Sequence, residues 1–328
     1  MRDSPPHLLD RPETAVDPLS DVLTLLNISA AYSTRLEAGG QWALSFKGYQ
    51  HAKIGAVLAG SCWYTAQGAP PMRLEAGDCF ILASGRPYQF SGDLDTTPVD
   101  GYPVYAEAGS ATIHYGSAPY SPDRTIMVGG NVNFDDTTAA LLLDVLPPIV
   151  CIGAASPSAE IVRPILQMLG DEIARSAPGT AVMAEHLTRI LFIQALRALL
   201  ADDGSEAPGW LGALNDPQIG PALTLMHEQA SQHWTVASLA TAVSMSRSAF
   251  SLRFKERVGL PPLEYLLRWR IRAAAHALQS GDRTVASVAA ESGYASESAF
   301  SNAFKRVTGA SPAQYRSKAR SISLGGPA

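Results

Sequence analysis

Residues 236–240 read VASLA, and residues 285–289 repeat this block as VASVA. A second block, SAF at 248–250 with FK at 254–255, returns fifty positions later as SAF at 298–300 with FK at 304–305. The first block is offset by 49 positions, so the second copy has one additional residue in its turn. The stretch from 235 to 316 therefore contains one structural unit twice.

Each copy has the local chemistry of a helix-turn-helix. Thr235 and Thr284 precede short apolar segments, and Ser246 and Ser296 precede the next ones, as helix N-caps do. The second helix of each copy has an apolar stripe at helical spacing, which buries one face and leaves the other free for a partner. The stripe residues are Phe250, Phe254 and Val258 in the first copy and Phe300, Phe304 and Val307 in the second. Gly259 and Gly309 follow, where a helix C-cap needs positive φ.

Residues 263–279 form the expected helix between the copies, with leucine and isoleucine on one side and Arg268, Arg270 and Arg272 among the rest. Such a helix is roughly 25 Å long. It would fix the separation of two recognition helices, and helices about 34 Å apart can enter successive major grooves of a duplex.

The repeat resembles the DNA-binding module of the AraC/XylS family of bacterial transcription regulators. The motifs that carry the resemblance are SGY at 292–294, SAFS at 298–301, AFKR at 303–306, GASP at 309–312 and YR at 315–316. The resemblance implies an all-α domain over 215–320 with units at 235–258 and 284–308, double-stranded promoter or operator DNA as partner, and RNA polymerase as a second partner if the protein is an activator.

The outward face of each recognition helix is the expected base-reading surface. The candidate DNA-binding residues are Arg247, Ser248, Ser251, Leu252 and Lys255 in the first copy and Glu297, Ser298, Ser301, Asn302 and Lys305 in the second. Well-known relatives often place Arg or Trp at the positions of Ser248, Leu252 and Asn302, so each contact here should be modest. Asn302 is the best candidate for adenine recognition, because a carboxamide can bond N6 and N7 together.

Charge is unequal between the two halves of the 328-residue chain. Residues 215–328 hold 13 Lys and Arg against 7 Asp and Glu, whereas residues 1–214 hold 12 against 23. The basic half contains the repeat, as expected of a polyanion-binding module joined to an acidic sensor. There is no apolar run of membrane length and no secretion signal, so a cytoplasmic protein without a membrane partner is predicted. Cys62, Cys79 and Cys151 are too far apart for a zinc site and are expected in the core.

Short apolar segments separated by Gly, Pro and Asp run from residue 29 to 134 and predict a β-barrel or jelly roll. The segments are 42–46, 54–58, 62–66, 80–82, 111–115 and 126–128. GSCW at 60–63, LEAGDCFIL at 74–82 and GRPY at 85–88 resemble the cupin domain at the start of many AraC-type regulators, over about 17–135. The barrel mouth is a usual place for a small effector, and Trp42, Trp63, Tyr88 and Tyr115 are the candidate ligand-binding residues.

Catalytic cupins hold a metal with a His-x-His pair and a Glu, then a further His. Here residues 53–59 read KIGAVLA and Tyr88 stands at the place of the later His. No metal, cofactor or catalytic residue is therefore expected, and His51 and His114 are taken as surface or hydrogen-bonded core histidines. Two alternatives stay open. One is a cupin metalloenzyme, an oxygenase or isomerase, with a fused DNA-binding tail, and the other is a DNA-binding dimer that needs no ligand.

Three helices are expected after the barrel, at 137–146, 158–174 and 180–200, in a dimerisation segment spanning 136–201. The third is apolar over a wide face that must be covered, either by the barrel or by the same helix of a second subunit in a homodimer. Residues 1–16 are expected to be a disordered start, 19–26 a short helix of the sensor domain, 202–214 a linker and 321–328 a tail. The predicted fold class is α+β multidomain: a cupin barrel with a helical segment, followed by an all-α double helix-turn-helix domain.

Overall fold

The computed structural model describes residues 17–26, 28–49, 52–83, 85–134, 139, 142–175, 177–201, 209–279 and 283–317. The predicted start, His51, the tail, much of the linker and most of the helix expected at 137–146 lie outside these residues. The chain divides into two compact units. Of the described residues, one unit takes those within Leu26–Gly212, and the other combines 17–25 with those from Ala213 to 317. No helix in the described ranges is long and apolar enough to cross a membrane.

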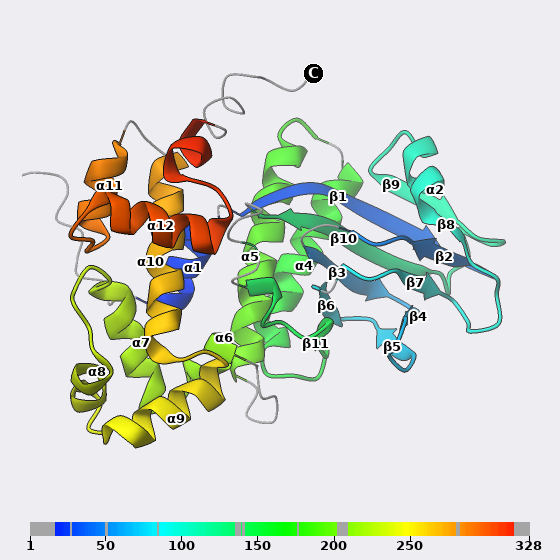
Figure 1. Ribbon diagram of the computed structural model, residues 1–328. Coiled ribbons are helices and arrows are strands. Elements are labelled where there is room, and N and C mark those ends of the chain that lie inside the picture. The colour runs from blue at the N-terminus through cyan, green and yellow to red at the C-terminus, as the bar shows by residue number, and fades with distance from the viewer. Residues whose placement is uncertain are drawn as a thin grey trace, which may run out of the picture. The chain divides into compact units, whose positions relative to one another are not determined.

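Two sheets face each other in the first unit and form the expected barrel (Figure 1). The six-stranded sheet has the order β11-β6-β3-β10-β1-β9, and the five-stranded sheet has the order β5-β4-β7-β2-β8. The strands are β1 Ser29–Ala38, β2 Ala43–Phe46, β3 Ala52–Ala59, β4 Ser61–Ala66, β5 Met72–Glu75, β6 Cys79–Leu82, β7 Tyr88–Ser91, β8 Val99–Asp100, β9 Thr112–Tyr115, β10 Thr125–Asn133 and β11 Ile149–Ile152.

Alternating side chains from both sheets fill the barrel. Leu36 and Ala38 of β1, Leu44 of β2 and Val57 of β3 join one buried cluster, which contains most of the barrel's aromatic rings. The strands had been predicted from short apolar segments separated by Gly, Pro and Asp. Strands β1, β5, β7, β8 and β11 were not predicted, because their apolar residues are few or follow a proline.

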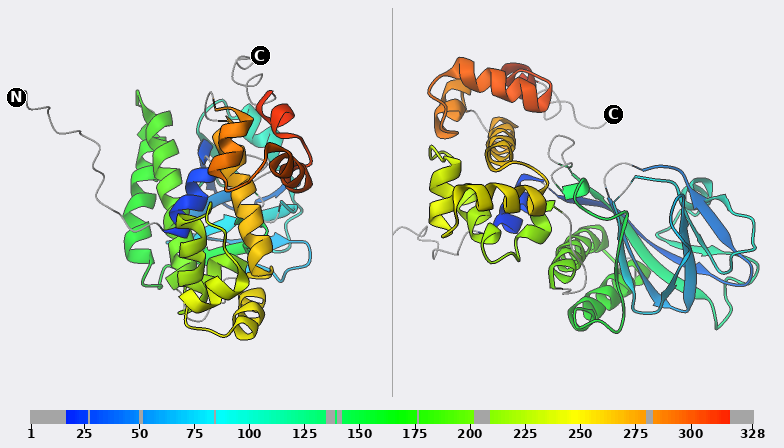
Figure 2. Two further views of the ribbon diagram at one scale, coloured as in Figure 1. Left: turned by 60° about the vertical axis from the view of Figure 1, so that its left-hand side comes forward. Right: turned by 60° about the horizontal axis from the view of Figure 1, so that its bottom comes forward.

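Helices α4 (Ala159–Arg175) and α5 (Thr180–Ala201) cover the outer face of the six-stranded sheet (Figures 1 and 2). Leu187, Leu191, Leu196 and Leu199 of α5 are buried within this unit. The barrel of the same chain therefore covers part of the apolar face of the third predicted helix. Its pairing with the same helix of a second subunit stays a prediction.

An unpredicted helix, α2 (Gly101–Glu107), packs on β2. Asp100 caps it by accepting the backbone N–H of Tyr102 at 3.0 Å. A Cβ at Gly101 would fall 2.5 Å from the ring of Phe46, so only glycine permits this approach. Tyr102 and Tyr105 then meet Phe46 edge-on, with ring centroids 5.7 and 5.6 Å away.

The second unit is all helical, and α10 runs between its two helix pairs (Figure 1). Its helices are α1 Pro18–Leu25, α7 Ile219–Glu228, α8 Val236–Ala242, α9 Arg247–Val258, α10 Pro262–Gln279, α11 Val285–Glu291 and α12 Glu297–Thr308. The short α6 (Gly209–Ala213) lies at the boundary between the units. Its Trp210 and Leu211 are buried, so the last residues of the predicted linker are a folded segment.

The first helix departs from the sequence-based expectation. Residues 19–26 were assigned to the sensor domain, but α1 packs on α7 and α10 of the helical unit. Asp21 Oδ2 lies 3.3 Å from Nδ1 of the buried His227, whose Nε2 lies 2.8 Å from the hydroxyl of Tyr265. Burial lowers the pKa of His227, and the nearby Asp21 opposes this shift. The apolar face of an amphipathic helix predicts that the helix packs on another apolar surface, but the helix sequence does not identify that surface.

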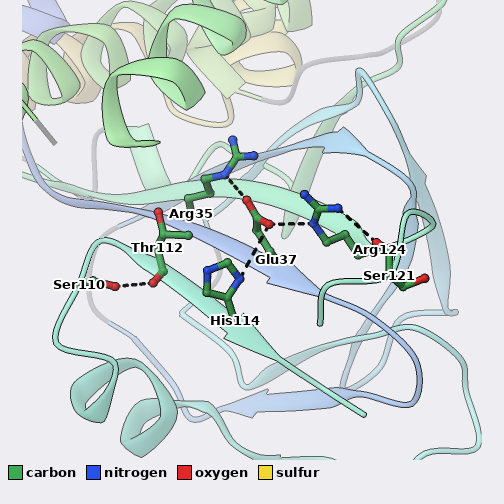
Figure 3. A network of polar contacts seen from close by, with 7 residues as sticks. All are labelled: Arg35, Glu37, Ser110, Thr112, His114, Ser121 and Arg124. Atoms are coloured by element: carbon green, nitrogen blue, oxygen red, sulfur yellow. Dashed lines mark hydrogen bonds and ion pairs between the residues drawn. The ribbon is translucent and has the colours of Figure 1, made fainter. Parts of the chain in front are cut away.

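A buried carboxylate on β1 contacts β9 and the residue that precedes β10 (Figure 3). Glu37 of β1 accepts a hydrogen bond from Arg35 at 2.8 Å and another from Arg124 at 2.7 Å. His114 Nδ1 of β9 lies 3.8 Å from the same carboxylate, which places this histidine in a structural ion cluster. Burial raises the pKa of Glu37, but the hydrogen bonds and charges of both arginines outweigh it, so the pKa lies below its usual 4.5.

Glu37→Gln should destabilise the barrel by about 1–3 kcal/mol at pH 7, since it removes the charge from both hydrogen bonds. Because the folded-state pKa is lowered, the carboxylate stabilises the protein above pH 4.5 and this contribution is lost as pH falls through the folded-state value. Urea unfolding at neutral and acidic pH should therefore show the variant and the parent converging in acid. Glu75→Gln, at an exposed residue with only a 3.8 Å contact to Arg73, should change little.

Candidate functional site

The two recognition helices have the same buried and exposed faces. In α9, Phe250, Phe254 and Val258 are buried, and in α12, Phe300 and Phe304 are fully buried. Val307, the third predicted stripe residue of α12, is only half-buried. Each stripe packs toward α10 or its partner helix, so the opposite face of each helix points away from the core.

The predicted caps fix where these helices begin and end. The hydroxyls of Thr235, Ser246, Thr284 and Ser296 each accept a backbone N–H of the first turn, at 3.0 to 3.3 Å. Gly259 and Gly309 close α9 and α12 with φ of 83° and 79°, a conformation that side chains with a Cβ rarely adopt. Local sequence therefore sets the register of both recognition helices.

Eight of the ten candidate DNA-binding residues are exposed on α9 and α12. Ser251 and Ser301 are half-buried, and the others are exposed: Arg247, Ser248, Leu252, Lys255, Glu297, Ser298, Asn302 and Lys305. Leu252 is 61% exposed, which is unusual for a leucine. It occupies in the first copy the place that Asn302 occupies in the second.

Positive charge on this side is only partly neutralised. Among the described residues, no acidic group lies within ion-pair distance of Arg247, Lys255 or Lys305. Arg253 and Arg257 of α9 instead pair with Asp216, at 2.9 and 3.4 Å. The cations without such partners remain available for phosphate groups.

Asp216 joins the start of α7 to the first recognition helix. Its Oδ1 accepts the backbone N–H groups of Gln218 and Ile219, both at 3.0 Å, and Arg253 Nε donates to Oδ2 at 3.0 Å. Burial alone would raise the pKa of Asp216. The hydrogen bonds from the two backbone N–H groups and from Arg253 outweigh burial, so the pKa lies below its ordinary value. No local sequence pattern signals the pairing of Asp216 with α9, because the two lie far apart along the chain.

A cavity of about 370 Å³ lies inside the barrel, under α2. Both sheets contribute to its wall, through Leu36, Phe46, Phe80, Tyr88, Phe90 and Met127, and α2 adds Tyr102 and Tyr105. Tyr88 stacks on Phe46 with ring centroids 5.0 Å apart. The volume and the aromatic wall are typical of a small-molecule site.

The sequence placed only one of its four candidate pocket residues in this cavity. Tyr88 lines it, whereas Trp42 and Tyr115 line a separate hollow near Gly116. Trp63 of β4 is half-buried and is not among the residues of the cavity wall. Aromatic type alone did not distinguish inward from outward positions. The missed residues of β3 and β10 could have been found only from the strand register, and those of α2 were missed because this helix was not predicted.

Two of the three cysteines lie in the core, as expected. Cys62 and Cys79 are buried, and burial raises the pKa of each thiol to about 12, but Cys151 is exposed on the edge strand β11. The core assignment of Cys151 was therefore wrong. Within the described ranges, no group of three or more His, Cys, Asp or Glu residues is placed to hold a metal ion.

A barrel with an internal cavity and a paired helix-turn-helix module in one chain define a transcription regulator that binds DNA. Comparison with known proteins agrees. A cupin family model matches residues 17–201, and a helix-turn-helix domain model matches residues 239–318. A putative AraC-like transcription regulator of Streptomyces lividans is 41% identical over 302 residues, covering 92% of this chain and 98% of the relative. The chain belongs to the family of AraC-like transcription regulators.

Two further proteins illustrate the range of similarity. The HTH-type transcriptional regulator AlkR of Acinetobacter baylyi is 29% identical over 306 residues, which cover 92% of this chain and 99% of AlkR. Among solved structures, the DNA-binding domain of AdpA in complex with a target DNA is 31% identical. The matched region covers 33% of this chain and 98% of that domain, with a TM-score of 0.32.

Proposed function

We propose that this regulator reads a specific DNA sequence with α9 and α12 and that a small effector in the barrel cavity controls its activity. The observation that carries the first part is the matched outward faces of the two recognition helices. Both present short polar side chains flanked by a lysine, at equivalent positions fifty residues apart. Side chains on such a face reach base edges when the helix enters a major groove.

The two copies should read different bases. Leu252 presents an apolar side chain, which favours contact with the methyl group of thymine. Asn302 presents a carboxamide at the equivalent position, and this group can donate to N7 or accept from N6 of adenine, or do both. Lys255 lies one helical turn after Ser251, and Lys305 lies one helical turn after Ser301. Both lysines suit phosphate contacts.

Asn302→Ala should cost about 1–3 kcal/mol of binding free energy on the cognate site and little on random DNA, because it removes a base contact. Lys305→Ala is the matched control on the same helix. It should weaken binding to both DNAs about equally and reduce the salt dependence, because fewer counterions are released. Fluorescence anisotropy at several salt concentrations measures both. Equal losses on cognate and random DNA for Asn302→Ala would show that Asn302 touches only the backbone.

We also propose that the protein is a homodimer assembled through α4 and α5. The barrel covers one face of this pair, yet several large apolar side chains of α4 and α5 remain exposed: Ile161, Met168, Val182, Met183 and Ile190. Ile161 and Met168 are seven residues apart on α4 and so lie on one face. A second copy would remove this surface from water. Light scattering at micromolar concentration should give a dimer mass, and Met168→Lys should shift it toward the monomer. An unchanged dimer in that variant would place the interface elsewhere.

A further inference from the structure

Among the described residues of the cavity wall, one has a charged side chain. That side chain is Lys53 of β3, opposite Asn131 of β10 in the strand register. The rest of the wall consists of apolar and aromatic groups, glycine backbone, and the polar side chains of Thr34, Asn131 and the tyrosines. The side chains of Thr34 and Tyr105 form a hydrogen bond with each other, so part of their hydrogen-bonding capacity is already used. The charge of Lys53 therefore dominates the electrostatics of the cavity.

The contacts of Lys53 do not neutralise its charge. Its Nζ donates to Oδ1 of Asn131 at 3.1 Å and lies 5.6 and 5.9 Å from the ring centroids of Tyr49 and Tyr88. These groups are uncharged, and no acidic side chain among the described residues lies within ion-pair distance of Lys53. Burial lowers the pKa of Lys53 from its ordinary value, as expected of an ammonium withdrawn from water without a counter-ion.

We propose that the cavity binds a monocarboxylate with an apolar body, whose acid group pairs with Lys53. This inference rests on the proposed function, in which the cavity is the effector site. An ammonium at the wall of an apolar cavity needs a charged partner once a ligand displaces the remaining water. A neutral ligand would remove that water and supply no charge in return. A doubly charged anion would need a second cation, and none stands among the wall residues that the structure describes.

The chemistry of the wall also defines the body of the ligand. Phe46, Phe80, Tyr88 and Phe90 form a continuous aromatic surface, with neighbouring ring centroids 5.0 to 5.5 Å apart. Tyr102 and Tyr105 of α2 close the cavity from above. An aryl or alkyl group can pack on these rings while a carboxylate at its end reaches Lys53 between β3 and β10.

Calorimetry of the full chain with matched probes tests the proposal. The acids are 4-phenylbutanoate and octanoate, and the controls are the primary amide and alcohol of the same carbon skeletons. We expect each acid to bind about ten- to a hundredfold more tightly than its amide, as for a hydrogen bond to a charged group. Lys53→Met should abolish this preference while leaving amide binding little changed. Lys47→Met, the same change at an exposed lysine of the same domain, should keep it.

Each outcome has a distinct meaning. Equal binding of acid and amide by the parent protein, or a preserved acid preference in Lys53→Met, would overturn the assignment of Lys53 but leave the cavity as an effector site for neutral compounds. Failure of all probes to bind would overturn the ligand class, and DNA binding measured on the same sample would show whether the regulator function stands. If Lys53→Met does not fold, Lys53→Arg replaces it as the test variant. Because Lys53→Arg keeps the positive charge, it should still bind each acid more tightly than the matching amide.

Discussion

Phe304→Ala should lower the stability of the second helix-turn-helix unit by about 3–5 kcal/mol and abolish binding to cognate DNA. The ring of Phe304 is fully buried, and its centroid lies 5.5 Å from those of both Phe300 and Tyr315. The core of this unit is small: among the described residues, eight from α10, α11 and α12 form one buried cluster. Such a core can collapse little around the cavity that the substitution leaves. The loss of stability should therefore be near the upper end of this range.

Urea unfolding followed by circular dichroism, together with anisotropy on the cognate DNA, measures both effects. Lys305→Ala, at the next residue, is the control: it should keep the stability of the parent and lose only phosphate affinity. A Phe304→Ala protein with parental stability would contradict the packing described for α12.

Asp216→Ala should destabilise the helical unit by about 3 kcal/mol and weaken cognate DNA binding. The substitution leaves two backbone N–H groups of α7 without their acceptor and leaves Arg253 and Arg257 without their buried counter-ion. Because those arginines belong to α9, the orientation of the first recognition helix depends on the same carboxylate.

Asp216→Asn separates the two contributions, since its amide oxygen still accepts the backbone N–H groups but has no charge for the arginines. Its loss of stability should fall between those of the parent and Asp216→Ala. Glu256→Ala removes an exposed acid from the same helix and should be close to neutral. If Asp216→Ala behaved like Glu256→Ala, the network between α7 and α9 would not contribute to stability.

Local sequence predicted the helix-turn-helix repeat with little error. Thr235, Ser246, Thr284 and Ser296 cap helices because each hydroxyl reaches an N–H only three residues away. Two phenylalanines four residues apart define a buried face by helical geometry alone. The exposure of Asn302 and Leu252 follows from the same geometry, so the outward face of each recognition helix was predicted before any tertiary contact was known.

Features that depend on distant parts of the chain were missed or misplaced. The packing of α1 on α7 and α10 was not predicted, because its apolar face fits any apolar surface until a partner such as His227 is known. The pairing of Asp216 with Arg253 joins residues 37 positions apart, and no local pattern reports it. Three of the four proposed pocket residues lie outside the cavity wall, because inward orientation depends on strand register.

The sequence alone determined that this chain has a β-rich cupin-like domain and a double helix-turn-helix, and which side of each recognition helix faces outward. Those features follow from short-range hydrogen bonds, helical spacing and turn geometry, which residues within about one turn decide. The tertiary structure alone decided where α1 packs, that Asp216 holds α9, and that Lys53 points into an aromatic cavity closed by α2. Each of these results from the pairing of distant segments, since burial and charge neutralisation are set by what surrounds a side chain and not by its neighbours in sequence.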